Sequence, residues 1–386
     1  MSLVQQAVSH HRSFRGQYTN VALVLQGGGA LGAYQGGVYQ ALSEAGCEPD
    51  WLCGISIGSI NAAIIAGNPP DKRVSALRSF WHRVTGGFVL PAPEYGDASR
   101  RYFNAVSAVA SLLGGQPDFF TPRFPPAILR AHGSDGAISV YDTSPLKATL
   151  EELIDFDLLN SGQLRLSLGA VNIRTGNFIY FDTQSTRIRV EHVMASGALP
   201  PGFPPVEIDG EHYWDGGLVS NTPLVQVLDG HVEENTLVFQ VDLFSARGDL
   251  PGDVLEAEER RKHISFSSRT RLNTDQFREK HRLRQAIVKL FERLPSEARQ
   301  EEEIRRLRDM GNDHEVAIVH LIYRRRSYEG QAIDFEFSRA SMLEHWAAGL
   351  NDAHQTLQSP QWLGAPNSLD GVQVFDILRD KVKSED

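Results

Sequence analysis

The chain has 386 residues, of which 41% are hydrophobic and 22% are charged, and its formal net charge is −10. These proportions are ordinary for a globular protein of one or two domains, and the acidic balance argues against a nucleic-acid-binding protein. The two cysteines, Cys47 and Cys53, cannot form a disulfide framework, and this usage suits a reducing compartment.

The first 18 residues are polar and lack the apolar core of a secretory signal. No apolar run in the sequence reaches the roughly 18 residues that a membrane-spanning helix requires. We therefore expect a cytoplasmic protein whose contact with a membrane, if it makes one, is peripheral.

Two strand–turn–helix units with glycine-rich turns follow. In the first, the apolar run Val21–Leu25 predicts a strand buried on both faces, and a helical pattern covers residues 33–42. In the second, residues 50–53 predict a strand and residues 59–66 predict a buried helix. In a parallel sheet both turns lie at the carboxyl edge of their strands, where ligands bind.

The second turn, Gly54-Ile55-Ser56-Ile57-Gly58, matches the Gly-x-Ser-x-Gly pattern of a nucleophile elbow. Gly54 and Gly58 leave room for a sharp turn that would place the Ser56 hydroxyl at the rim of the sheet, near a helix N-terminus. A serine in a glycine-rich turn can also be purely structural, so the pentapeptide alone does not decide between the two.

The first turn, residues 26–32, reads Gln-Gly-Gly-Gly-Ala-Leu-Gly and has three functional interpretations. A dinucleotide-binding loop is weakly supported, because the acidic residues about 20 positions on do not end a second strand, and a P-loop lacks its Gly-Lys-Ser/Thr. An oxyanion hole needs bare backbone N–H groups beside a helix N-terminus, and it alone explains why a serine elbow follows. A plain structural turn is the remaining alternative.

A third motif, Asp215-Gly216-Gly217, follows an aromatic and proline-rich stretch over residues 200–214. Asp-Gly-Gly by itself indicates a turn. An aspartate held rigidly among aromatic residues is also partly desolvated, which suits a general base.

Together the tri-glycine turn, the Gly-x-Ser-x-Gly elbow and the Asp-Gly-Gly motif resemble the patatin-like phospholipases over about residues 18–245. Residues 195–206, Asn221 and Pro223 also fit that family's pattern around the aspartate. The resemblance implies an α/β/α sandwich with a mainly parallel sheet and a hydrolase that cleaves carboxylic esters of lipids through an acyl-enzyme. It implies no metal and no organic cofactor.

The resemblance also implies the roles of individual residues. Ser56 would be the nucleophile and Asp215 the base of a dyad without histidine. The oxyanion hole would lie at Gly27, Gly28, Gly29 and Ile57, with backbone N–H groups of Gly28 and Gly29 as its main donors. The turns would be supported by Gly32, Gly54, Gly58, Gly216 and Gly217.

Leu31 departs from the family, which often has Arg or Lys at this position. A cation at the oxyanion site is then missing or comes from elsewhere, and an arginine at residue 31 is expected to leave activity unchanged or to raise it.

Three alternatives stay open. The first is a Ser–Asp–His triad, for which the downstream candidates are His231, His263, His281, His314, His320, His345 and His354. The second is an esterase or depolymerase acting on non-membrane esters. The third is a non-catalytic module that binds acyl chains or a partner. The sequence does not predict the oligomeric state.

The remaining patterns outline a catalytic domain over residues 18–250. An amphipathic helix is predicted over 72–84, a helix from 142–145 to about 159, a strand over 164–172 with a hairpin partner at 177–182, and a core strand over 237–244. Residues 86–136 are too long and too apolar for a linker. They predict an insertion that forms an acyl pocket or lid, or alternatively a helical cap that only packs on the core.

Residues 251–386 predict a C-terminal extension. It begins with charged helices over 256–310, returns to the sheet with a strand near 315–323 and ends with an amphipathic helix over 341–358. A basic stretch with interleaved phenylalanines, residues 269–291, is interpreted as part of a solvated, salt-bridged helix pair rather than as a contact for anionic lipid.

Overall fold

The computed structural model describes residues 18–378 with short gaps at 94–95, 135, 230–233, 268–269, 327, 331–332 and 359–370. Nine strands of the described chain form one sheet in the order β11-β10-β9-β1-β2-β5-β8-β7, and β6 pairs with β5. The parallel strands are β1 (Asn20–Leu25), β2 (Trp51–Ile55), β5 (Arg165–Asn172), β9 (Thr236–Asp242), β10 (Val316–Ile322) and β11 (Val372–Phe375). The antiparallel strands are β6 (Phe178–Asp182), β7 (Val206–Ile208) and β8 (Glu211–Asp215).

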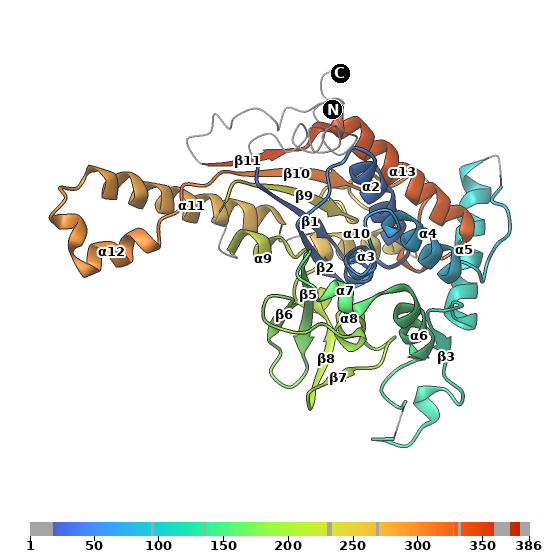
Figure 1. Ribbon diagram of the computed structural model, residues 1–386. Coiled ribbons are helices and arrows are strands. Elements are labelled where there is room, and N and C mark those ends of the chain that lie inside the picture. The colour runs from blue at the N-terminus through green and yellow to red at the C-terminus, as the bar shows by residue number, and fades with distance from the viewer. Residues whose placement is uncertain are drawn as a thin grey trace.

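Helices cover both faces of the sheet, as Figure 1 shows. Alternate residues of β1 serve the two faces: Leu23 and Leu25 join the larger core cluster, whereas Ala22 and Val24 join the smaller one. The larger cluster lies under α2 (Gly32–Glu44), α3 (Ile57–Ala66), α4 (Arg73–Val84) and α13 (Arg339–Leu357). The smaller one lies under α9 (Leu224–Asp229) and α11 (Thr270–Arg293). The predicted α/β/α sandwich with a mainly parallel sheet is confirmed.

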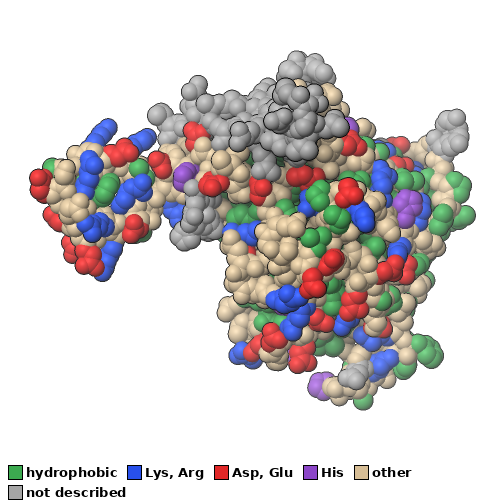
Figure 2. Space-filling view, viewed as in Figure 1, with side chains coloured by type: hydrophobic (Ala, Val, Ile, Leu, Met, Phe, Trp, Pro, Cys, Tyr) green, Lys and Arg blue, Asp and Glu red, His purple; other side chains and the backbone are tan. Residues whose placement is uncertain are grey.

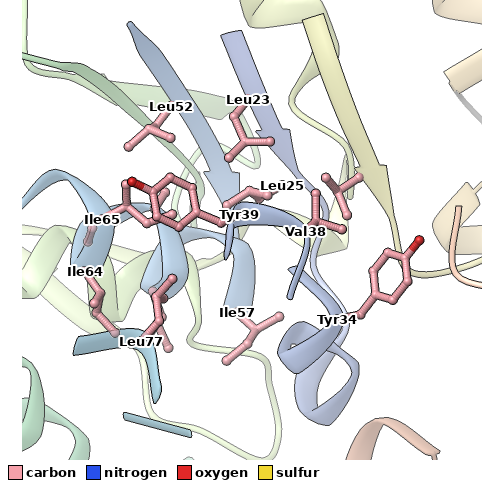
Figure 3. Close-up of a cluster of buried hydrophobic side chains, with 14 of the residues drawn as sticks. Leu23, Leu25, Tyr34, Val38, Tyr39, Leu52, Ile57, Ile64, Ile65 and Leu77 are labelled. Atoms are coloured by element: carbon pink, nitrogen blue, oxygen red, sulfur yellow. The ribbon is translucent and has the colours of Figure 1, made fainter. Parts of the chain in front are cut away.

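The centre of the larger core is formed by the two strand–turn–helix units (Figure 3). Leu52 of β2, Val38 of α2 and Ile64 of α3 are each fully buried and gather around β1. Continuous apolar strands suit this position because a parallel sheet is covered on both faces. The same packing fixes where the turns at the ends of β1 and β2 lie.

The predicted helix that ends near residue 159 is wrong as a single element. The structure has two helices, α6 (Ser144–Leu153) and α7 (Phe156–Leu159). Ile154 is extended, and the carboxylate of Asp155 accepts hydrogen bonds from the N–H groups of Asp157 and Leu158 at 2.9 Å each. The aspartate therefore starts a new helix, as an N-cap does.

The segment over residues 86–142 contains α5 (Asp97–Gly114) and a two-stranded hairpin of β3 (Thr121–Pro122) and β4 (Tyr141–Asp142). The short helix α8 (Val190–Ser196) precedes β7 and β8, and Asp215 is the last residue of β8. Single-turn 3-10 helices occur at Gly29–Leu31, Ala127–Leu129, Gly216–Leu218, Ala298–Gln300 and Ile333–Phe335.

The residues after 250 continue the same sheet and core. The charged region consists of α10 (Val254–Ser267), α11 and α12 (Glu302–Asp309), and α11 with α12 extends away from the sheet (Figure 1). The strand β10 then pairs with β9, as predicted, and α13 packs against α2. The sheet continues across residues 250–251. The division of the chain into two domains at this point stays a prediction.

Candidate active site

Ser56 stands between β2 and α3 with φ of 56° and ψ of −127°. A positive φ at a residue other than glycine costs roughly 1–3 kcal/mol and is found mainly where the surroundings enforce it. Here α3 packs so closely on β1 that a Cβ at Gly58 would lie 2.3 Å from the carbonyl oxygen of Leu25. The turn thus has the strained strand–helix geometry of a nucleophile elbow.

Ser196, at the end of α8, supports the elbow from the outside. The Ser56 N–H donates to the Ser196 carbonyl at 3.1 Å and to its Oγ at 3.2 Å. The Ser196 hydroxyl in turn donates to the Gly169 carbonyl at 2.6 Å and lies 2.6 Å from the Ser59 Oγ. This buried serine therefore ties the turn to β5 and α3, a positioning role that the sequence pattern around residues 195–200 did not reveal.

Asp215 is 1% exposed and ends β8, where it lies opposite Ala170 of β5. Its Oδ1 accepts the Gly217 N–H at 2.7 Å, and its carboxylate also interacts with the Ser56 hydroxyl. Burial raises the pKa of Asp215 to about 7, although both hydrogen bonds act in the opposite direction. The sequence predicted a turn at this point; the structure adds the strand that aims the aspartate at the serine.

The tri-glycine turn at the end of β1 lies beside the elbow. Gly29 has φ of 56°, and a Cβ there would lie 2.2 Å from the carbonyl oxygen of Asp334. The N–H groups of Gly28, Gly29 and Ile57 have no hydrogen-bond partner among the described residues, and all three residues line the same cavity as Ser56. The helix α3 begins at Ile57, so its N-terminal dipole points at this cavity.

Gly27 differs from its neighbours. Its N–H donates to the Asn221 carbonyl at 3.2 Å, so this group is already engaged. The Asn221 side chain returns a hydrogen bond from Nδ2 to the Gly27 carbonyl at 2.9 Å. This reciprocal pair joins the turn to the segment just after Asp215, and it leaves Gly28, Gly29 and Ile57 as the available oxyanion donors.

Gln26 holds the other side of the turn and was not singled out from the sequence. It is fully buried, and its Oε1 accepts the N–H groups of Leu243 at 2.5 Å and Phe244 at 3.0 Å. Its Nε2 donates to the Thr222 hydroxyl at 3.0 Å. A buried amide with these partners fixes the start of the glycine turn. A polar residue at the end of an apolar strand was the available signal.

The cavity around Ser56 and Asp215 has largely apolar walls. Phe119 and Phe120 come from the inserted segment, whereas Phe266, Phe335 and Phe337 come from beyond residue 250. The other apolar side chains in the wall are Ile57, Ile60, Leu199, Phe203 and Phe244. The insertion therefore contributes directly to this cavity rather than only packing on the core; that the cavity holds an acyl chain stays a prediction.

Among the described residues, no histidine lines this cavity. His263 packs against Phe244 and lines a second cavity, and His281 stacks on Phe277. His345 and His354 contact Glu329 and Glu44. His320 is half-buried on β10, His314 follows α12, and His231 lies outside the described residues.

The structure places Leu31 outside the wall of the Ser56 cavity. Its side chain is 1% exposed and lines the second cavity, together with Arg325 and Arg326, rather than the cavity of Ser56. This second cavity is lined by acidic side chains, Glu256 and Glu259 among them, as well as by arginines. Of the two outcomes expected from the sequence, this position of Leu31 favours unchanged activity of Leu31→Arg over raised activity, and both stay predictions.

We expect Leu31→Arg to lower the free energy of unfolding by about 1–3 kcal/mol, because it forces a longer, charged side chain into a packed core position. Chemical denaturation measures this change. Leu31→Met, which nearly conserves the volume, should cost less than about 1.5 kcal/mol. Equal free energies of unfolding of the arginine and methionine variants would show that the packing around residue 31 has room for a longer, charged side chain.

Two further observations concern the cysteines and the helices. Both cysteines are buried, and burial raises the pKa of the Cys53 thiol, so it behaves as a core residue rather than as a nucleophile. Within the described residues, no helix combines the length and the hydropathy needed to cross a bilayer.

Comparison with known proteins gives one consistent result for sequence families. A model described as patatin-like phospholipase matches residues 23–228, which is more than half of the chain, and a model described as patatin phospholipase matches residues 264–369. Triacylglycerol lipase ptl3 of Schizosaccharomyces pombe is 41% identical over 87 residues, which are 22% of this chain and 18% of that protein. The uncharacterized NTE family protein Mb2594 of Mycobacterium bovis is 29% identical over 205 residues, 53% of this chain and 27% of that protein. These matches thus span about a quarter or less of the relatives' length.

Two solved structures are also similar. VipD from Legionella pneumophila has a TM-score of 0.40 and 15% identity, with coverage of 95% of this chain and 73% of that one. The type III effector protein ExoU has a TM-score of 0.33 and 16% identity, with coverage of 88% and 53%.

Proposed function

Because this chain belongs to the patatin-like phospholipase family, we propose that it hydrolyses carboxylic esters of lipids with Ser56 as nucleophile and Asp215 as general base. The observation that carries the proposal is that a strained serine and a buried aspartate share one apolar-walled cavity and interact there. A carboxyl with a pKa near 7 is well matched to accept a proton at neutral pH.

In the proposed reaction the Ser56 Oγ attacks the acyl carbonyl carbon while its proton passes to Asp215. The negative oxygen of the tetrahedral intermediate would accept hydrogen bonds from the N–H groups of Gly28, Gly29 and Ile57. Collapse breaks the ester bond, and Asp215 returns the proton to the leaving alcohol, which leaves an acyl-enzyme. Asp215 then takes a proton from water as the water oxygen attacks the acyl carbonyl carbon. Collapse of this second tetrahedral intermediate breaks the bond to the Ser56 Oγ, Asp215 returns the proton to that oxygen, and the carboxylic acid leaves.

The oxyanion assignment is testable at Gly28. A Cβ there would lie 2.7 Å from the Leu243 Cδ1 and 3.0 Å from the Leu243 Cβ, so alanine must displace either the Leu243 side chain or the turn. We expect Gly28→Ala to lower kcat by roughly 10²–10³-fold, the usual effect of losing one oxyanion donor, with a smaller change in KM. Steady-state kinetics on a soluble ester measures both. Gly28→Ala combined with Leu243→Ala, which makes room for the methyl group, should recover part of kcat relative to Leu243→Ala alone. Wild-type turnover in Gly28→Ala would mean that the turn is only structural.

The proposed function itself is tested with a fluorophosphonate probe and a substrate panel. We expect the probe to label Ser56, and we expect hydrolysis of glycerolipid acyl esters to exceed hydrolysis of short water-soluble esters and of polyesters. Preference for the soluble esters or for a polyester would favour the esterase or depolymerase alternative. A folded protein that takes no label and hydrolyses none of them would favour the acyl-binding module. Location in the cytoplasm stays a prediction.

A further inference from the structure

Helix α5 (Asp97–Gly114) has its polar and apolar faces reversed relative to a helix that packs on a core. Its buried residues include Arg100, Ser107 and Ser111. Its exposed large apolar residues are Tyr102 at 74%, Val106 at 40%, Val109 at 53%, Leu112 at 40% and Leu113 at 76%. Spacings of three and four residues place most of these on one stripe. In water such a helix normally buries the stripe.

Specific contacts fix this reversed orientation. The Arg100 guanidinium lies 3.0 Å from the Glu344 carboxylate, donates to the Ser341 hydroxyl at 3.0 Å and stacks on the ring of Tyr328. At the other end of the helix, the Ser111 hydroxyl accepts the Gln116 Nε2 at 2.6 Å. Arg100 therefore anchors the polar face of α5 to α13 and to Tyr328, and the apolar stripe faces outward.

The loop between β3 and β4, residues 123–140, presents more apolar side chains. Phe124 and Ile128 are each 92% exposed and Leu129 is 74% exposed. Arg130 holds this loop in shape, because its Nε donates to the Pro125 carbonyl at 2.9 Å and its Nη2 to the Phe124 carbonyl at 3.2 Å. The loop thus satisfies part of its own backbone while its largest apolar groups project into solvent.

The helix and the loop meet at a base that continues into the candidate active site. The Tyr141 hydroxyl, at the foot of the loop, donates to the Leu112 carbonyl of α5 at 2.8 Å. The Tyr141 ring packs on Phe120 and Phe203, and both of these phenylalanines line the cavity of Ser56. Figure 2 shows apolar side chains along the right edge, over α5, and at the lower right, over the loop.

We propose that the exposed apolar residues of α5 and of the 123–140 loop form a docking surface for lipid bilayers or micelles, called here the lipid-facing surface. This inference rests on the proposed lipid ester hydrolase and assigns the part of the chain that brings the cavity to its substrate. The projecting side chains suit fluid acyl chains, into which separate apolar groups insert one by one. Arg123 and Arg130 are engaged with Asp142 and loop carbonyls, and the chain carries a net charge of −10, so apolar insertion rather than charge attraction is the driving force.

Vesicle sedimentation tests the surface without any turnover. The Ser56→Ala protein, used so that lipid is not consumed, is mixed with phosphatidylcholine vesicles. Two double variants, Phe124→Asp with Ile128→Asp and Val109→Asp with Leu113→Asp, should each weaken binding by about 10-fold or more, since each removes two exposed apolar side chains that would become buried in the bilayer. The matched control is Leu283→Asp with Leu290→Asp, which changes two similarly exposed leucines (64% and 62%) on α11, on the other side of the molecule. It should leave binding within about twofold, and high salt should weaken binding little.

The outcomes separate this surface from its rivals. Unchanged vesicle binding by both α5 and loop variants would overturn the proposal, as would binding that requires anionic lipid and is lost in high salt. A wild-type dimer that the same substitutions dissociate, measured by analytical ultracentrifugation, would instead assign the surface to a second copy of the chain. With Ser56 intact, the loop and α5 variants should hydrolyse a soluble ester at the wild-type rate while losing activity on vesicles. If the wild-type chain hydrolyses no ester but the vesicle results hold, the proposed function fails and the lipid-facing surface stands.

Discussion

Replacing Ser56 with alanine is expected to lower ester hydrolysis by roughly 10⁶-fold, the effect of removing the nucleophile in serine hydrolases, and to abolish fluorophosphonate labelling. The fold should survive, because the backbone N–H of residue 56 keeps both of its hydrogen bonds to Ser196. Hydrolysis of a soluble ester, together with circular dichroism on the same sample, measures both expectations. Full residual hydrolysis by a folded Ser56→Ala protein would remove Ser56 from the mechanism.

A second substitution at the same residue separates chemistry from backbone strain. Ser56→Gly lacks the hydroxyl as well, so its activity should fall as far as that of Ser56→Ala. Glycine adopts a φ of 56° without the steric cost that alanine retains, so Ser56→Gly should be more stable than Ser56→Ala by about 1 kcal/mol. Equal melting temperatures of the two variants would show that the turn stores little strain.

Much of the fold follows from local patterns in the sequence. The apolar run Val21–Leu25 is buried on both faces, and the amphipathic pattern near residues 72–84 became α4. The hairpin over residues 165–182 also formed where its turn residues indicated. These elements are predictable because their hydrophobic periodicity and their turn residues agree.

Elements that depend on distant partners were harder to predict. The strand β8 has partly polar residues and is defined by pairing with β5, about 40 positions earlier in the sequence, which a local pattern does not encode. The short edge strand β11 (Val372–Phe375) was missed for the same reason.

In the candidate site, too, residues in local motifs were predictable and residues that depend on distant partners were not. Ser56, Asp215 and the tri-glycine turn were found because each lies in a short motif whose glycines have a local steric reason. The supporting residues Ser196 and Gln26 were missed, because their roles consist of hydrogen bonds to β5, α3 and the segments after β8 and β9. The aromatic wall could not be derived either, since it joins side chains that lie more than 200 positions apart.

Asp215→Asn is expected to remove nearly all activity and, at the same time, to stabilise the protein. As the general base, Asp215 accounts for roughly 10²–10⁴-fold of the rate or more. Because its pKa in the folded chain is about 7, kcat/KM of the wild type should fall tenfold per pH unit below that value rather than below about 4. Steady-state kinetics between pH 5 and 9 measures the loss of activity in Asp215→Asn and the pH dependence of kcat/KM in the wild type. Single alanine substitutions of the seven downstream histidines should leave most of the activity. A loss at one of them as large as that of Asp215→Asn would favour the Ser–Asp–His triad.

The stability effect follows from the same raised pKa. Between about pH 4 and pH 7 the unfolded carboxyl is ionised while the folded one still binds its proton, so the stability of the wild type falls as the pH rises through this window and then levels off. Asparagine is neutral in both states and keeps an oxygen for the Gly217 N–H. The gain in unfolding free energy of Asp215→Asn over wild type should therefore be larger at pH 8 than at pH 5, by about 2–3 kcal/mol.

Asp334 supplies the matched control, because among the described residues it is the other carboxylate that lines the cavity and burial raises its pKa as well. Its partner is Lys262, whose Nζ lies 2.5 Å from the Asp334 carboxylate. In the proposed reaction Asp334 exchanges no proton with Ser56. The fall of kcat/KM on the acid side should therefore still begin near pH 7 in Asp334→Asn. If the acid limb moves in Asp334→Asn and stays in place in Asp215→Asn, the group that titrates during catalysis is Asp334, and the assignment of Asp215 as base is wrong.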